Sequence, residues 1–234
     1  TISSPPTLTP HNEDGTYTYM LTAYPFISNS LANPINYINE TSNQNSINMV
    51  LTNASLIFKP IPELAIKISG GIENTDSRSD NYVSINFVNS AGNASVSTSQ
   101  YTSLLSENTI SYNKTYNEKH SFSAVVGYTY QNFLSKYLSG SGVGFLSDTQ
   151  ETYELQASTT PGIPSSGYSK SVLKSYLTRL NYNYNDKYLV TVSARADGSS
   201  KYSKGNKWGY FPSAALAWKY QMKISSKRSI LSQH

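Results

Sequence analysis

Arg195 and Asp197 carry opposite charges two residues apart in the chain. Because side chains alternate along a strand, residues at this spacing lie on the same face of an extended segment. An arginine and a carboxylate placed in this way can contact a polar substrate, or they can form a salt bridge with each other. Of these two interpretations, we favour the salt bridge.

The remaining polar residues do not suggest catalysis or metal binding. The histidines stand at positions 11, 120 and 234, too far apart for the usual spacing of metal ligands. The chain has no cysteine, which excludes a disulfide, a thiolate zinc site and a cysteine nucleophile. No Ser-His-Asp arrangement can be proposed from the spacing. We therefore expect no enzymatic activity, no cofactor and no bound metal.

Two short segments resemble ligand-binding loops only in part. Residues 139–144 are rich in glycine and serine, but the Gly-Lys-Ser/Thr that completes a phosphate loop does not follow. We expect a flexible loop there. Residues 197–200, Asp-Gly-Ser-Ser, contain the small and acidic residues of a calcium loop. A turn at a strand end explains them more simply, because Gly and Asp tolerate turn geometry.

The composition excludes several classes of protein. Only 14% of the 234 residues are charged, and the 20 tyrosines make up most of the aromatic residues. The net charge of +4 comes entirely from residues 219–234, which hold four basic residues and no acid. The neutral remainder does not favour a nucleic-acid partner. The longest uninterrupted apolar run, residues 214–218, is far shorter than the roughly 20 residues of a membrane helix.

Alternation of apolar and polar residues, typical of β-strands, is the dominant pattern. It is clearest in residues 120–133, where Phe122, Val126 and Tyr130 oppose small and polar side chains. We expect seven strands, at about 47–59, 64–78, 98–113, 120–133, 175–185, 188–197 and 209–220. Strands in soluble proteins are usually about five or six residues long, so these favour a large barrel or a long solvated sheet.

The expected connections alternate between short and long. The short ones are 59–63, 113–119 and 185–187, and the long ones are about 79–97, 134–171 and 198–207. Outer-membrane barrels have short periplasmic turns and long extracellular loops, with aromatic girdles where the strands leave the lipid. Aromatic residues do gather near the strand ends. The alternative from the pattern alone is a soluble β-sandwich whose tyrosines line the edge of its core.

The segment 175–218 resembles the SusC/RagA-type TonB-linked outer-membrane transporters of Bacteroidota. It reads SYLTRLNYNYNDKYLVTVSARADGSSKYSKGNKWGYFPSAALAW. It is similar to the family's Tyr-Leu-x-Arg-x-Asn-Tyr strand, its Asp turn, its Arg-x-Asp-Gly-Ser-Ser stretch and its Asn-Lys-Trp-Gly-Tyr-Phe-Pro-Ser block. Looser similarity extends upstream through residues 107–112 and 33–37 to about residue 10.

This resemblance implies an all-β fold: an antiparallel transmembrane β-barrel segment of about seven strands from a barrel of about 22. Residues 47–220 would be the partial barrel, 1–46 an extracellular loop and 221–234 a basic tail outside the family pattern. We expect an interior barrel fragment without the family's N-terminal plug. Because such a fragment leaves two sheet edges unpaired, the isolated chain is expected to aggregate or to be degraded.

The resemblance also implies a location and a set of partners. It predicts an outer-membrane protein of a Gram-negative, Bacteroidota-like cell, in contact with lipid, which imports oligosaccharides or peptides. A SusD-like surface lipoprotein would capture the substrate, and TonB-ExbB-ExbD would act through the missing N-terminal region. The alternative is a surface-exposed β-rich glycan-binding or adhesin module, although the alternating connections argue against it.

On the barrel interpretation, each face of a strand has a different environment. Arg195 and Asp197 would face the lumen, where they contact substrate or plug, or form a salt bridge near the rim. Tyr210 would face lipid and Phe211 the lumen. For these two residues and Trp208 we favour packing in an aromatic girdle or against a loop over contact with a ligand.

Overall fold

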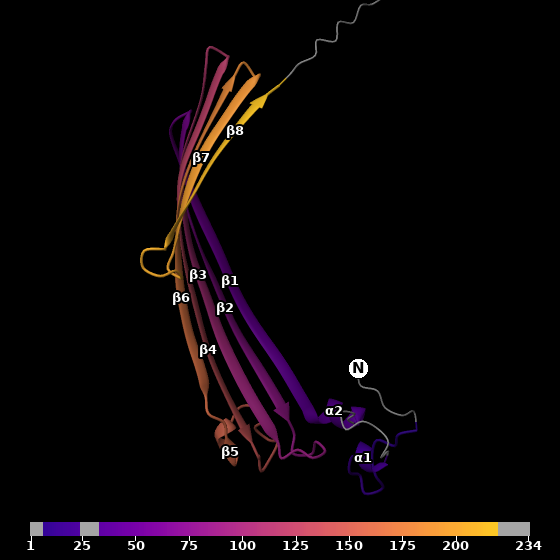
Figure 1. The fold of residues 1–234 in the computed structure, drawn as a ribbon. Helices are drawn as coiled ribbons and strands as arrows, with labels where there is room; N and C mark the ends of the chain where they lie inside the picture. Colours follow the sequence, from indigo (N-terminus) through magenta and orange to yellow (C-terminus); the bar gives the residue numbers. More distant parts are fainter. Residues whose placement is uncertain (1–6, 24–32, 220–234) are drawn as a thin grey trace, which may run out of the picture. The chain divides into compact units, whose positions relative to one another are not determined.

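The computed structural model describes residues 7–23 and 33–219, and most of this part of the chain is β-strand (Figure 1). The long strands in it are β1 Thr41–Ile61, β2 Leu64–Val83, β3 Asn93–Tyr116, β4 His120–Val143, β6 Ser165–Tyr184, β7 Tyr188–Ser199 and β8 Trp208–Trp218. The short elements are α1 Met20–Ala23, α2 Pro34–Glu40, the 3-10 turn η1 Leu155–Ala157 and β5 Thr160–Pro161. No helix in the described ranges is long and apolar enough to cross a membrane.

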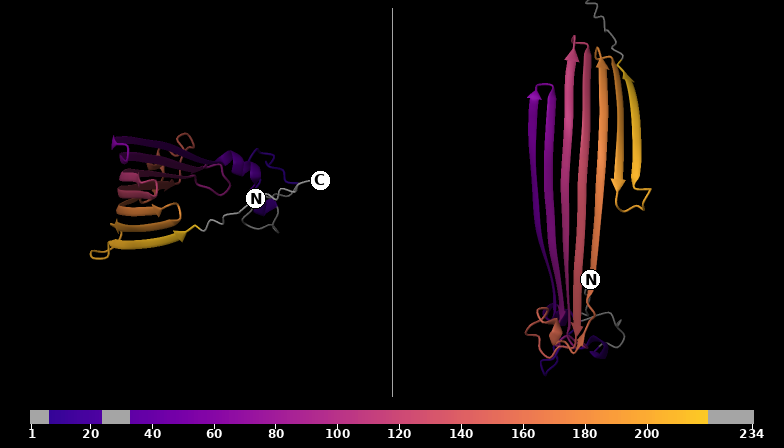
Figure 2. Two further views of the ribbon diagram at one scale, coloured as in Figure 1. Left: turned by 90° about the horizontal axis from the view of Figure 1, so that it is seen from above. Right: turned by 90° about the vertical axis from the view of Figure 1, so that its left-hand side faces the viewer.

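The strands form one sheet in the order β1-β2-β3-β4-β6-β7-β8, with β5 paired to β4. Neighbours in the sheet are therefore also neighbours in sequence, apart from the short β5, as Figure 2 shows. β7 pairs antiparallel with the second part of β6, Leu173–Tyr184, and with all of β8. The predicted all-β antiparallel fold and its seven long strands are confirmed.

The strands extend further than the sequence pattern predicts. β1 begins at Thr41, within the stretch expected to be a loop, and the predicted long loops 79–97 and 134–171 shrink to 84–92 and 144–164. The flexible loop expected at 139–144 is wrong, because β4 continues to Val143 and its last residues pair with β5. These extensions are rich in polar residues and show no regular apolar alternation, but a backbone ladder does not depend on side-chain polarity.

The chain divides into two compact units, which we describe separately. Unit 1 comprises the described residues up to Thr52, together with Ile72–Ser103 and Phe133–Lys170. Unit 2 comprises Asn53–Gly71, Leu104–Asn132 and the described residues from Ser171 onwards. The strands β1 to β4 and β6 contribute residues to both units.

In unit 1, two asparagines connect α2 to its surroundings. Asn33 caps α2, since its side-chain oxygen accepts a hydrogen bond from the Ile35 amide at 3.1 Å. Asn36 is 1% exposed, and its side chain both donates to the Asn86 carbonyl and accepts from the Val88 amide. The helix is therefore fastened to the loop 84–92.

In unit 2, the short turns lie next to one another at one end of the strands. The turns 117–119 and 185–187 each join two strands and begin with two residues of positive φ, Asn117-Glu118 and Asn185-Asp186. Backbone hydrogen bonds connect the ends of neighbouring hairpins: Asn113 to Glu63 at 2.8 Å, Asn185 to Lys119 at 2.6 Å and Lys219 to Lys187 at 2.8 Å. The short connections occur where the sequence predicts them.

Candidate functional site

Unit 2 has one apolar and one polar face, and the strand register keeps the two apart across β6, β7 and β8. Directly opposite residues of antiparallel strands point to the same face. Val190 lies opposite Tyr182 on one side and Leu216 on the other. On the polar face, Ser193 lies opposite Arg179 and Ser213. The division into faces predicted from the alternation is confirmed for these strands.

An aromatic band lies on the apolar face beside the short turns; we call it the turn-end band. The His120 Nδ1 atom and the Tyr182 hydroxyl are 2.7 Å apart, and the His120 ring also contacts Tyr184. Tyr184 stacks on Tyr188, which lies opposite Trp218 in the register. The band continues into β3 and β4 through Tyr112, Tyr116 and Phe122.

A second aromatic band lies on the same face further along these strands; we call it the loop-end band. Tyr176 contacts Tyr128, with ring centroids 5.2 Å apart, and stacks on Trp208 at 5.9 Å. Tyr210 lies opposite Ala196 in the register, next to this group. The sequence predicts girdle or loop packing for Trp208 and Tyr210, and Trp208 does pack within an aromatic cluster.

The apolar surface between the two bands, which we call the belt, has the dimensions of a lipid contact. Along β8, Tyr210 and Trp218 are eight residues apart, or about 26 Å at the rise of a strand. At a tilt of 35–45°, this corresponds to a height of about 20 Å, close to the apolar band of outer-membrane barrels. The belt is exposed: Tyr210 is 74% and Leu216 82% accessible. A contiguous apolar surface of this size marks contact with lipid or with another protein.

The polar face carries the predicted salt bridge. The Nε atom of Arg195 donates to Asp197 at 2.8 Å, and its Nη2 atom lies 3.3 Å from the Ser175 hydroxyl. Phe211 lies opposite Arg195 in the register, on this same face, as predicted. The same face also carries hydroxyl and amide groups, including Thr191 bonded to Asn181 at 2.9 Å. This face can bind polar chains, but it holds no group positioned as a nucleophile or a general base.

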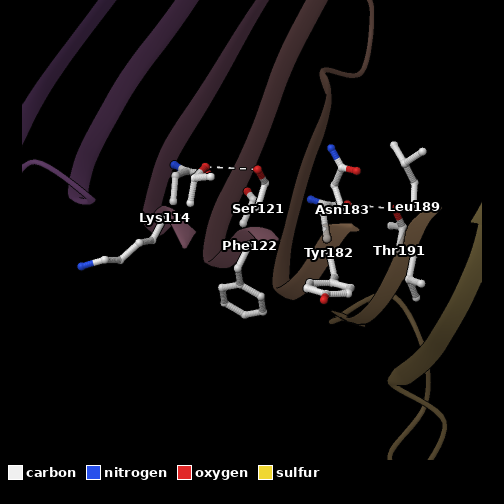
Figure 3. A pocket seen from close by; sticks show the side chains of 12 residues that line it. Lys114, Ser121, Phe122, Tyr182, Asn183, Leu189 and Thr191 are labelled. Atoms are coloured by element: carbon white, nitrogen blue, oxygen red, sulfur yellow. Dashed lines mark hydrogen bonds between the residues drawn. The ribbon is translucent and has the colours of Figure 1, made fainter. Parts of the chain in front are cut away.

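A hollow of about 420 Å³ lies near the short turns, and its lining comes from both sides of the sheet (Figure 3). Phe122 and Tyr182 extend to one side of the ribbon, and Asn183 and Leu189 extend to the other. The cation that lines it, Lys114, is paired with Glu63 at 3.2 Å. The residues described contain no group of three His, Asp or Glu side chains that could hold a metal.

In unit 1, Asp148 fastens the loop 144–164 to the end of β2. Its carboxylate accepts hydrogen bonds from the Tyr82 hydroxyl, the Ser84 hydroxyl at 2.8 Å and the Ile85 amide at 2.9 Å. Burial raises the pKa of Asp148, but the hydrogen bonds from Tyr82, Ile85 and Ser84 together outweigh it and hold the pKa below its ordinary value. No local pattern points to Asp148 in the sequence, because its partners lie more than 60 positions away.

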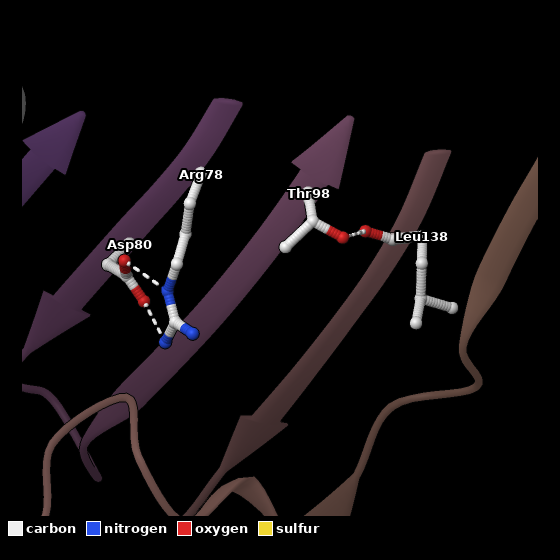
Figure 4. A network of polar contacts seen from close by, with 4 residues as sticks. All are labelled: Arg78, Asp80, Thr98 and Leu138. Atoms are coloured by element: carbon white, nitrogen blue, oxygen red, sulfur yellow. Dashed lines mark hydrogen bonds and ion pairs between the residues drawn. The ribbon is translucent and has the colours of Figure 1, made fainter. Parts of the chain in front are cut away.

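Unit 1 also contains a polar network in which an arginine and an aspartate stand two residues apart, as Arg195 and Asp197 do in unit 2. Arg78 makes two hydrogen bonds of 2.8 Å to Asp80, and the neighbouring Thr98 lies 3.4 Å from the Leu138 carbonyl (Figure 4). The Arg-x-Asp spacing of β2 was a signal for this pair that the sequence analysis did not use. With Thr102 bonded to Asn74 at 2.8 Å, this part of β2 is polar, whereas its first half carries isoleucines.

Several residues considered in the sequence analysis have other positions. His11 forms a bridge with Tyr17 and also contacts its ring, far in sequence from His120. Gly198 and Ser199 belong to the end of β7, in agreement with a strand-end turn rather than a calcium loop. Tyr220, His234 and the basic tail 221–234 lie outside the described residues.

Comparison with known proteins gives the family. No protein-family model matches the chain. TonB-dependent receptor P3 of Formosa agariphila is 30% identical over 91% of this chain and 21% of its own length. TonB-dependent receptor SusC of Bacteroides thetaiotaomicron is 31% identical over 82% of this chain and 19% of its own length.

Solved structures agree on the fold. A structure of the RagAB peptide transporter matches 76% of this chain with a TM-score of 0.72 at 21% identity, over 20% of its own chain. The present chain thus spans about a fifth of the length of the proteins that it matches. In sequence and in fold, the chain is a SusC/RagA-like segment of the TonB-dependent receptor class.

Proposed function

We propose that these strands form part of the wall of an outer-membrane transporter that imports oligosaccharides or peptides. The observation that carries the proposal is the register of β6, β7 and β8, which places apolar and aromatic side chains on one face and polar ones on the other. The belt and its two aromatic bands fit a lipid layer with two interfaces. The wall would begin with β1 at Thr41 rather than at the expected residue 47.

In this proposal the polar face lines the passage for substrate. Its hydroxyl, amide and paired charged groups suit the hydroxyls of an oligosaccharide or the amides of a peptide. One structural relative is described as a peptide transporter, which supports the second class. A SusD-like lipoprotein would meet the long-loop end, and TonB-ExbB-ExbD would act on another part of the receptor. The transport reaction requires no covalent chemistry.

Cysteine substitutions in β8 test the proposal, because this segment has no cysteine of its own and any cysteine elsewhere in the receptor can first be replaced by serine. Leu216→Cys would face lipid, and its neighbour Ala215→Cys would face the water-filled passage. In outer membranes that contain the receptor, a water-soluble maleimide should label Ala215→Cys and leave Leu216→Cys unmodified. Equal labelling of both would refute the proposal and would favour a glycan-binding sheet with water on both faces.

A further inference from the structure

Four lysines of unit 2 gather beside the loop-end band, and we call them the lysine cluster: Lys174, Lys201, Lys204 and Lys207. Lys174 lies opposite Gly198, and its Nζ atom is 5.9 Å from the centre of the Tyr130 ring. The other three belong to the loop 200–207 between β7 and β8. All four side chains are exposed.

The loop that carries three of the lysines is held in place at its base. The Ser199 amide donates to the Lys207 carbonyl at 2.9 Å, which closes the loop. Ser200 exchanges two hydrogen bonds with the backbone of Val172, two residues before Lys174. The loop therefore ends directly at Trp208, which stacks on Tyr176 and, like Lys174, lies opposite Gly198 in the register.

No carboxylate of the described residues is paired with these lysines. The three ion pairs in this part of the chain involve Arg78, Lys114 and Arg195. Between residues 171 and 219 the acids are Asp186 and Asp197. Asp186 lies in the turn at the other end of the strands, and Asp197 is held by Arg195 on the polar face. The cluster thus keeps an uncompensated positive charge, which complements an anionic partner.

We propose that the lysine cluster binds the phosphorylated headgroups of the lipid layer that surrounds the belt. This inference rests on the proposed membrane function. Aromatic rings of a barrel girdle lie at headgroup depth, and lysines beside them extend their ammonium groups to the phosphates. The belt leads directly into the loop-end band and then into the cluster, so a lipid whose acyl chains cover Tyr210 and Pro212 places its phosphate near the lysines.

The two tryptophans of the chain allow a test at each band separately. Trp218→Phe leaves Trp208 as the reporter of the loop-end band, and Trp208→Phe leaves Trp218 as the reporter of the turn-end band. Each variant is made in the receptor that contains these strands, with every tryptophan outside this segment replaced by phenylalanine, and the receptor is folded from urea into phosphatidylcholine vesicles that contain a small fraction of phosphatidylglycerol. Bromine, which quenches tryptophan, is placed on the acyl chains of one lipid or of the other.

We expect the quenching of Trp208 to show that phosphatidylglycerol is enriched beside it about fivefold over its fraction in the bulk lipid. This figure corresponds to the attraction of one lysine to an anionic surface. Glutamine at all four lysines should abolish the enrichment at Trp208 and leave quenching of Trp218 unchanged, whereas arginine at all four should preserve it. As a matched control, glutamine at Lys59, Lys119, Lys187 and Lys219 should not alter the enrichment at Trp208. High salt should weaken it by screening.

Two results would contradict the inference in different ways. If brominated phosphatidylcholine quenches both tryptophans but phosphatidylglycerol is not enriched at Trp208, the lysine cluster has no preference for anionic lipid and the membrane function stands. If neither tryptophan is quenched by either lipid, the belt does not face lipid, and the proposed function fails together with the inference.

Discussion

An arginine placed in the middle of the belt should destabilise the folded protein far more than an arginine on the adjacent polar position. Val192 is suited to this test because it lies between Leu180 and Ala214 on the apolar face and is 48% exposed. Its neighbour Ser193 points to the opposite face, next to Arg179 and Ser213. Val192→Arg and Ser193→Arg introduce the same side chain one residue apart.

The size of the effect follows from the position of Val192 between the bands. Val192 is four residues from Tyr188 and four from Ala196, which lies opposite Tyr210. These distances are about 13 Å along the strand, or about 10 Å of depth at the tilt of a barrel. Arginine at this depth costs about 2–4 kcal/mol, which lowers the folding equilibrium constant about 30- to 900-fold.

The assay is a urea titration of the receptor that contains these strands, with each variant in turn, folded into phospholipid vesicles and followed by tryptophan fluorescence. For Ser193→Arg we expect a loss of about 1 kcal/mol at most, from the hydrogen bond to Ser213. Val190→Arg, nearer the turn-end band, should cost about 1–2 kcal/mol, because the penalty falls towards the interface. Equal costs at Val192 and Ser193 would show that both faces meet water and would refute the assignment of the belt.

Further predictions concern the loop fastening and one close contact. Asp148→Asn should lower the free energy of opening of the loop 144–164 by about 1–3 kcal/mol, because an amide cannot accept from all the donors around it; faster hydrogen exchange at Ile85 would show this. Since folding lowers the pKa of Asp148, the stabilisation by its carboxylate is present above the unfolded pKa of about 4 and is lost as the pH falls through the folded pKa. Hydrogen exchange at the Ile85 amide, corrected for the intrinsic effect of pH, should therefore accelerate in acid. In the Asp148→Asn variant this acceleration should be absent. Gly198→Ala should cost about 1–3 kcal/mol in the urea titration, because its new Cβ would lie 2.9 Å from ring atoms of Trp208; a cost unchanged in a Trp208→Ala background would contradict this reason.

The order of residue types along the chain is enough to predict which residues share a face and where the hairpins turn. Tyr182, Val190 and Leu216 could be assigned to one face before any register was known, because the alternation of a strand does not depend on its neighbours. The turn at Asn185-Asp186 was likewise predictable, since these residue types tolerate positive φ. The same local order, together with the motif of residues 175–218, carried the family resemblance.

The length of the strands and the fastening of the loops depend instead on contacts between segments that are distant in the chain. Val143 ends a strand rather than lying in a loop because the neighbouring β5 completes its backbone ladder, and that partner lies 17 residues further on. Asp148 finds its donors at Tyr82 and Ser84, and Asn36 finds its partners at Asn86 and Val88. Such contacts join distant segments through single polar groups, which leave no periodic trace in the sequence, whereas burial of a continuous apolar face does.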